Sequence, residues 1–155
     1  MATKSKNREL QAVTGFNLAK LNVVQDRPAA AIPILKKLVE DSDSLGLKAL
    51  SVRASVYLSQ ALLATGKPQD AQQELDRTMN RAEKLGLLVE QARAHYLLGE
   101  IYSRTGKTKE YAPQYQEAVR ILESISKESG AGRLLDRFDL KDVYHDAIKS
   151  YQGAA

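Results

Sequence analysis

Apolar residues return every three or four positions along most of the chain, which is the spacing of an α-helix with one buried side. Between residues 48 and 65 the pattern is carried by Leu50, Ala54, Tyr57, Leu58, Ala61 and Leu62. It stops at the turn Gly66-Lys67-Pro68, where glycine suits the end of a helix and proline suits the first turn of the next one. It then resumes over residues 71–82. The pattern predicts two helices joined by a tight turn.

This helix–turn–helix unit is repeated at a spacing of forty residues. Leu45-Gly46-Leu47 recurs as residues 85–87, and Thr65-Gly66-Lys67 recurs as residues 105–107. A more divergent copy comes first, in which Pro28 aligns with Pro68 and Asp26 takes the place of the turn glycine. Because fixed-period repeats stack on one another, we expect three helical hairpins over residues 8–46, 47–86 and 87–129, preceded by a frayed segment, 1–7.

The remaining segment, residues 130–155, predicts a linker and one further helix. Ser129-Gly130-Ala131-Gly132 is typical of a link, and Asp139 is a suitable N-cap for a helix. An apolar stripe follows at Leu140, Val143, Tyr144, Ala147 and Ile148. We interpret this helix as a cap that covers the last face of an open stack.

Two prolines fall where the repeat predicts helix interior. Pro33 and Pro113 occupy equivalent positions in the second helices of the first and third hairpins. Because proline removes a backbone hydrogen bond and clashes with the preceding turn, either these helices begin late or they bend.

Composition narrows the class of protein. The chain has 155 residues, of which 43% are hydrophobic and 27% charged, so it can bury a core and is not disordered as a whole. The absence of cysteine excludes disulfides and thiolate metal sites. No apolar run is long enough to cross a bilayer, and we expect a cytoplasmic protein. The net charge of +4 favours acidic partners but does not indicate nucleic-acid binding.

The repeat resembles the tetratricopeptide repeat. In the third hairpin, the positions that carry the family's pattern are Leu98, Gly99, Tyr102, Gly106, Tyr115 and Ala118. The second hairpin keeps small residues, Ser59 and Thr78, where the family has glycine and alanine. The period of forty exceeds the family's 34, and Tyr111 stands where an alanine is expected. The resemblance implies an all-α fold, a right-handed superhelical solenoid of about three hairpins plus the capping helix.

The same resemblance implies where a partner would bind. In this family the first helix of each hairpin lines a concave groove. Carried over to this chain, the groove residues are Phe16, Lys20, Arg53, Val56, Gln60, Arg93, Tyr96, Glu100 and Arg104. Arginine and lysine interleaved with apolar side chains suit a peptide or helix that carries acidic groups.

Candidate catalytic chemistry is sparse. Gly106-Lys107-Thr108 imitates the end of a phosphate-binding loop, but Ile101 stands where that loop needs glycine. His95 falls at a core position, which favours a packed, hydrogen-bonded imidazole. No nucleophile with a neighbouring base and no set of metal ligands is apparent. We expect no catalysis, no cofactor and no metal.

Three functions stay open on the sequence alone. The leading hypothesis is a scaffold or regulatory module that binds a protein or peptide in the groove. The second is an RNA-binding helical repeat, which the 19 acidic residues disfavour. The third is self-assembly by end-to-end stacking through an uncovered face of Leu10, Leu18 or Leu21.

Overall fold

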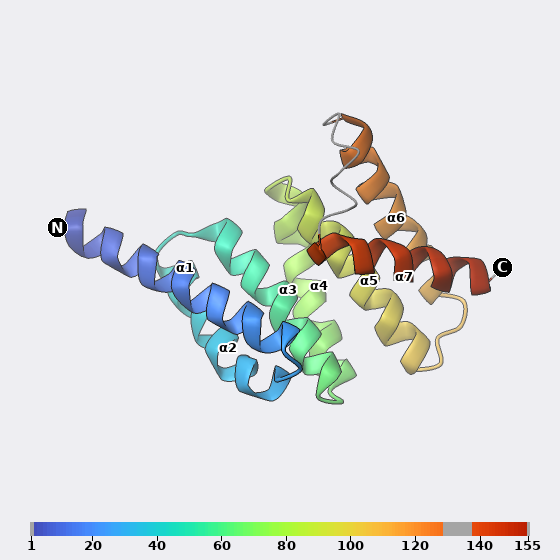
Figure 1. The fold of residues 1–155 in the computed structure, drawn as a ribbon, viewed down its shortest axis with the longest axis horizontal. Helices are drawn as coiled ribbons and strands as arrows, with labels where there is room; N and C mark the ends of the chain where they lie inside the picture. Colours follow the sequence, from blue (N-terminus) through green and yellow to red (C-terminus); the bar gives the residue numbers. More distant parts are fainter. Residues whose placement is uncertain (1, 129–137, 155) are drawn as a thin grey trace. The chain divides into compact units, whose positions relative to one another are not determined.

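The computed structural model describes residues 2–128 and 138–154, and every regular element within these ranges is an α-helix (Figure 1). The seven helices are α1 (Ala2–Val24), α2 (Pro28–Ser44), α3 (Lys48–Ala64), α4 (Pro68–Lys84), α5 (Leu88–Arg104), α6 (Tyr111–Glu128) and α7 (Phe138–Ala154). The predicted all-α class is therefore confirmed for the described part of the chain. No helix in that part is long and apolar enough to span a bilayer.

The structure differs from the sequence prediction at both ends. α1 begins at Ala2, so residues 2–7, predicted to be frayed, continue the helix. α7 begins at Phe138, so Asp139 lies in its first turn rather than at the N-cap. The predicted link of residues 129–132 lies outside the described residues.

Five of the turns share one backbone geometry. Each contains one residue in the left-handed region: Asp26 (φ 61°), Gly46 (73°), Gly66 (78°), Gly86 (64°) and Gly106 (75°). The amide of the next residue donates to the carbonyl five positions earlier: Arg27 to Asn22, Leu47 to Ser42, Lys67 to Leu62, Leu87 to Ala82 and Lys107 to Tyr102, at 2.8–3.0 Å. This is the Schellman motif, which satisfies the last carbonyls of a helix. The prediction that Asp26 takes the place of the turn glycine is therefore confirmed.

The four prolines do not all occupy the same position within their helices. Pro28 and Pro68 open α2 and α4, as predicted. Pro113 is the third residue of α6, because that helix begins only at Tyr111. No intrahelical bond is lost there, since the first amides of a helix have no partner. Pro33 lies inside α2, where an intrahelical hydrogen bond is lost. A late helix start thus explains Pro113 but not Pro33.

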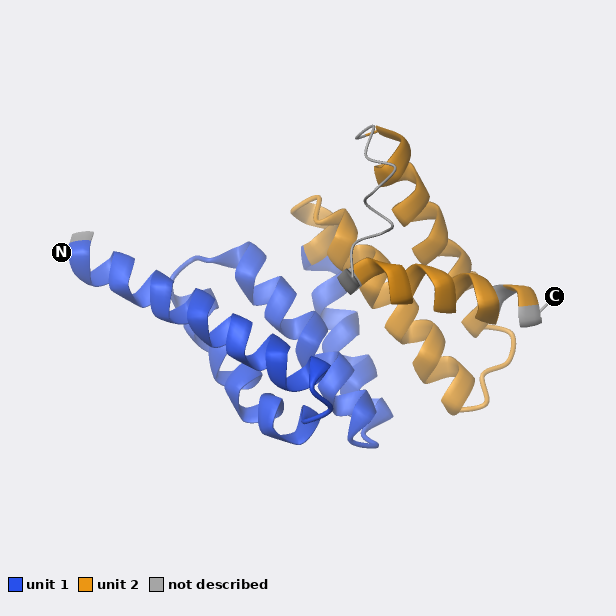
Figure 2. Ribbon diagram, viewed as in Figure 1, with its two compact units in different colours: residues 1–81 blue, residues 82–155 orange. Residues whose placement is uncertain are grey.

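The chain divides into two compact units, residues 1–81 and 82–155 (Figure 2). In unit 1, α1 and α2 form a hairpin, and α3 packs mainly against α2 while also touching α1. In unit 2, α5 and α6 form a hairpin, and α7 packs mainly against α6 while also touching α5. α7 therefore contacts both helices of the hairpin before it, as α3 does in unit 1.

The buried positions follow the forty-residue register. Small residues are buried in the first helix of each hairpin, at Ala19, Ser59 and Gly99. Large residues are buried in the second helices, at Leu35, Leu75 and Tyr115. In unit 2 a further apolar cluster joins Leu140 of α7 to Ala92, Ile121 and Leu122 of the hairpin. Small residues let neighbouring helices approach closely while large ones fill the space between them.

Candidate functional site

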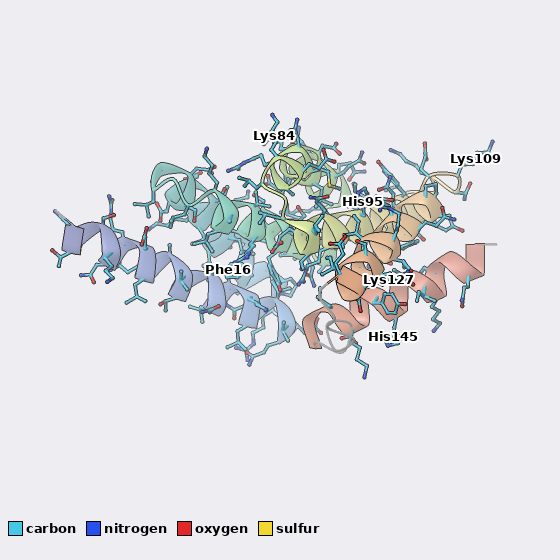
Figure 3. All side chains as sticks on the ribbon, turned by 90° about the horizontal axis from the view of Figure 1, so that it is seen from above. Phe16, Lys84, His95, Lys109, Lys127 and His145 are labelled. Atoms are coloured by element: carbon cyan, nitrogen blue, oxygen red, sulfur yellow. The ribbon has the colours of Figure 1, made fainter. Side chains whose placement is uncertain are left out.

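In unit 1 the predicted groove residues Phe16 and Lys20 lie beside Tyr57 of α3, which is only 6% exposed and belongs to the core. The ring of Phe16, on α1, meets the ring of Tyr57 edge-on, with their centroids 5.5 Å apart, and Figure 3 labels Phe16 on its helix. The ammonium of Lys20 lies 5.9 Å from the centroid of the Tyr57 ring, within the range of a cation–π interaction. Two aromatic rings and one cation from α1 and α3 are thus brought together.

Two other predicted groove residues share the face of α3 that carries Tyr57. Arg53 and Gln60 lie one turn before and about one turn after Tyr57 and therefore project on the same side. Arg53 is exposed and Gln60 is half-buried. Val56 is only 1% exposed, so it belongs to the core and offers no surface to a partner. We call Phe16, Lys20, Arg53 and Gln60 the α1–α3 face, and Tyr57 is its buried neighbour.

In unit 2 the predicted residues surround the carboxylate of Glu100. One oxygen, Oε1, accepts a hydrogen bond from the hydroxyl of Tyr115 on α6 at 2.7 Å. The other, Oε2, lies 3.3 Å from a guanidinium nitrogen of Arg104, one helical turn later. Because both oxygens have partners, this carboxylate is held in place between α5 and α6.

Tyr96 joins this cluster and connects it to α7. Its ring centroid lies 5.9 Å from that of Tyr115. Burial raises the pKa of Tyr96, and the negative charges of Glu100 and Asp146, with a hydrogen bond to Asp146, raise that pKa further. Asp146 belongs to α7, so part of the α5 surface predicted to face a partner already faces the chain's own last helix.

The pKa of Tyr115 is also raised. Burial is the main cause, and the hydrogen bond to Glu100 together with its negative charge adds to it. A hydrogen bond from Ser150, also on α7, opposes this shift. The phenol therefore stays protonated and continues to donate to Glu100 well above the usual titration range of tyrosine.

The predicted groove residues thus fall into two groups. Those of the α1–α3 face lie at or near the surface of unit 1. Those of unit 2 are mostly internal, since Arg93 is 9% exposed and Tyr96 and Glu100 are bonded within the unit; only Arg104, with 55% of its side chain exposed, is open.

Sequence reasoning placed Tyr57 on the buried stripe of its helix, and the structure confirms that it is buried. It missed two contributors to the cluster of unit 2. Asp146 and Ser150 lie in α7, outside the repeat, and nothing in the forty-residue register relates them to α5.

Among the described residues, no group of three or more histidine, aspartate or glutamate side chains could hold a metal ion. His95, labelled in Figure 3, places its Nδ1 2.7 Å from Oε1 of Gln114. Since an amide oxygen only accepts, Nδ1 carries the proton. The predicted hydrogen-bonded imidazole is confirmed.

Unit 1 also contains an open hollow of about 490 Å³ between α1 and α2. Its lining includes Arg8, Lys37 and Asp41 together with apolar side chains. These charged residues are exposed, and none of the predicted groove residues lines the hollow.

Comparison with known proteins does not assign the chain to a family: no protein-family model matches it, and no curated protein matches it significantly.

Proposed function

We propose that the protein is a non-enzymatic, tetratricopeptide-like interaction module that binds an acidic, amphipathic segment of another protein. The observation that carries this proposal is the α1–α3 face. It places the half-buried ring of Phe16, which packs on the buried Tyr57, on the same face as the cations Lys20 and Arg53. Aromatic and arginine side chains are the residue types enriched at the energetic centres of protein interfaces.

The chemistry of this face indicates the kind of partner. The guanidinium of Arg53 can form a two-point contact with a carboxylate. Phe16 is half-buried, so its exposed part offers apolar surface for a neighbouring side chain. A segment with alternating acidic and apolar positions matches both features. RNA is a poorer match, because a strand needs a continuous basic track for its phosphates.

The packing inside each unit supports the proposal that the bound segment is helical. The α1–α2 hairpin packs against one further helix, α3, and the α5–α6 hairpin packs against α7. In α7 the residues Leu140, Val143 and Ala147 contribute to the packed side at helical spacing. Recognition of an amphipathic helix through apolar positions at i, i+3 and i+7 is a common mode of binding.

Selection from a peptide library tests the proposal. Random peptides of helical length are displayed and selected against the purified chain, and the peptides recovered are synthesised. We expect enrichment of aspartate and glutamate among apolar positions, and an affinity that falls as salt is raised, because exposed charge pairs are screened. The double variant Lys20→Glu/Arg53→Glu should weaken binding by about tenfold or more, as expected for two lost charge contacts.

Lys36→Glu provides a matched control. Lys36 is an exposed cation of the same unit but lies on α2, so its reversal changes the net charge without altering the α1–α3 face. Its effect on affinity should be below about twofold, as for a charge outside the interface. Circular dichroism checks that each variant keeps its helices. Equal affinity of the selected peptides for the double variant and the parent chain would contradict the proposal.

A further inference from the structure

The side of α1 that faces away from α2 is apolar and exposed. Its exposed residues are Leu10 (64%), Val13 (45%), Leu18 (53%), Leu21 (49%) and Val24 (56%). At 100° per residue these five positions fall within one arc of about 140°. The buried residues Ala12 and Ala19 lie on the opposite side of the helix. We call the five exposed residues the outer stripe.

Two residues of α3 that align with the outer stripe in the forty-residue register are buried. Leu18 and Leu21 align with Leu58 and Ala61 of α3, which are 4% and 0% exposed. α3 is covered by α2 as well as by α1. A helix that is apolar on all sides is ordinarily buried on all sides. α1 therefore has the composition of a helix with neighbours on two sides, but the described residues leave its outer stripe exposed.

We propose that a second copy of this chain covers the outer stripe, with the two α1 helices packed antiparallel around a two-fold axis at Asn17. The stripe is self-complementary about that residue. Leu10 and Val24 lie seven positions on either side of Asn17, and Val13 and Leu21 lie four positions on either side. An antiparallel pair thus sets Leu10 against Val24 of the second copy and Val13 against Leu21, as a two-fold contact requires.

The polar residues of the helix agree with this arrangement. Lys20 is the one charged residue between positions 10 and 24, and its ammonium lies near the Tyr57 ring, so no like charges oppose one another across the axis. Asn17 is exposed at the centre of the stripe. A single asparagine in an apolar helical seam fixes the register of the pair through a hydrogen bond to its counterpart.

The apolar area of the outer stripe determines how stable the proposed dimer should be. It offers on the order of 400 Å² of apolar surface per copy, about half of what a standard stable interface buries on each partner. We therefore expect a reversible dimer whose population rises with concentration. Stacking into filaments is not expected, because a two-fold contact closes on itself.

Sedimentation velocity over a range of protein concentrations tests the dimer. The parent chain should pass from monomer to dimer and no further. Leu21→Glu places a charge near the centre of the stripe, against Val13 of the second copy, and should raise the dissociation constant by at least about tenfold, since a buried unpaired charge is costly. Leu88→Glu is the matched control: Leu88 is also an exposed leucine, 40% exposed, but lies on α5, and its substitution should leave dimerisation unchanged.

A chain that stays monomeric at all concentrations would overturn the proposal, as would a dimer that Leu21→Glu leaves intact. Larger species growing without limit would also overturn it, because they need a contact that does not close.

Cysteine cross-linking tests the orientation of the helices. The chain has no cysteine, so an introduced one reports a single position. Asn17→Cys should cross-link to itself under mild oxidation. Leu10→Cys should cross-link to Val24→Cys when the two variants are mixed, but not to itself. Efficient self-linking of Leu10→Cys would indicate parallel helices and would contradict the antiparallel pair.

Discussion

Gly99 of α5 lies directly against the ring of Tyr115 on α6. A Cβ atom at Gly99 would lie 2.6 Å from Cε1 of that ring, much closer than two carbon atoms approach in a folded protein. The ring cannot readily withdraw, since it is 2% exposed and its hydroxyl is bound to Glu100 at 2.7 Å. The glycine of the third hairpin is therefore required by the large residue opposite it.

Gly99→Ala should lower the free energy of unfolding by about 1–2 kcal/mol. Overpacking of this kind costs roughly 1–3 kcal/mol, of which up to about 1 kcal/mol is recovered because alanine favours a helix more than glycine does. The midpoint of urea unfolding, followed by circular dichroism, measures the change.

Two further variants separate the clash from a general effect of alanine. Gly15→Ala should raise the free energy of unfolding by up to about 1 kcal/mol, because a Cβ there meets only Leu38 at an ordinary 4.0 Å. Tyr115→Leu combined with Gly99→Ala should be less destabilising than the sum of the two single changes. Additive effects would show that the ring and the glycine are not coupled.

Ser42→Ala should stabilise the protein by about 1 kcal/mol. The hydroxyl of Ser42 is fully buried and has no hydrogen-bond partner among the described residues. Burying an unpaired hydroxyl costs roughly 1–3 kcal/mol, and alanine removes it without leaving a large cavity. Thermal unfolding would detect the increase.

Ser59→Ala is the control for that experiment. Ser59 is equally buried, but its hydroxyl donates to the carbonyl of Ser55 at 2.9 Å. Its removal should leave stability unchanged or lower it slightly. If Ser42→Ala proved as neutral or as harmful as Ser59→Ala, the hydroxyl of Ser42 would have to be satisfied by bound water.

The sequence predicted those features that depend on a few neighbouring residues. The left-handed turns at Asp26, Gly66 and Gly86 were found because their chemistry is local. For Pro113 the sequence alone allows either a late helix start or a bend, and α6 in fact begins at Tyr111. The pairing of a small residue in one helix with a large one in the next was visible as a pattern at Ser59 and Gly99, but the direct contact of Gly99 with Tyr115 required coordinates.

The candidate site was less predictable, because exposure depends on which helices pack together. Arg53 and Arg93 occupy equivalent positions of α3 and α5 in the forty-residue register, yet Arg53 is exposed and Arg93 is only 9% exposed. Asp146, which contacts Tyr96, comes from a helix outside the repeat. Spacing along the sequence identifies a face of a helix, whereas the neighbours of that face are decided by tertiary packing.

The stability of unit 2 should fall as the pH rises above about 10. Tyr115 has a raised pKa in the folded protein, chiefly because it is buried and because it donates to Glu100. The pKa of Tyr115 in the folded protein exceeds its unfolded value of 10.0. Its interactions therefore contribute fully to the free energy of unfolding below pH 10.0, and this contribution decreases as the pH rises toward the folded pKa. The difference in unfolding free energy between the parent chain and Tyr115→Phe should therefore shrink above about pH 10.

Absorbance at 295 nm provides an independent measurement of the same phenol. The chain has seven tyrosines, and Tyr115 should not ionise while the protein is folded. The rise in tyrosinate absorbance between about pH 9 and pH 11 should then be the same in Tyr115→Phe as in the parent chain. A smaller rise in the variant would show that Tyr115 titrates with an ordinary pKa.

Asp26→Gly should stabilise the first turn. Asp26 adopts a φ of 61°, a conformation that costs most non-glycine residues roughly 1–2 kcal/mol and aspartate somewhat less. Part of this gain is offset by the larger entropy of glycine in the unfolded chain, so we expect a net increase of about 0.5 kcal/mol in the free energy of unfolding. The reciprocal change, Gly66→Asp, should lower it by a similar amount, because no atom lies within 4 Å of a Cβ at Gly66 (φ 78°) and only the backbone is strained. If Asp26→Gly instead destabilised the protein, the aspartate side chain itself, rather than its tolerance of a left-handed backbone, would have to stabilise the turn.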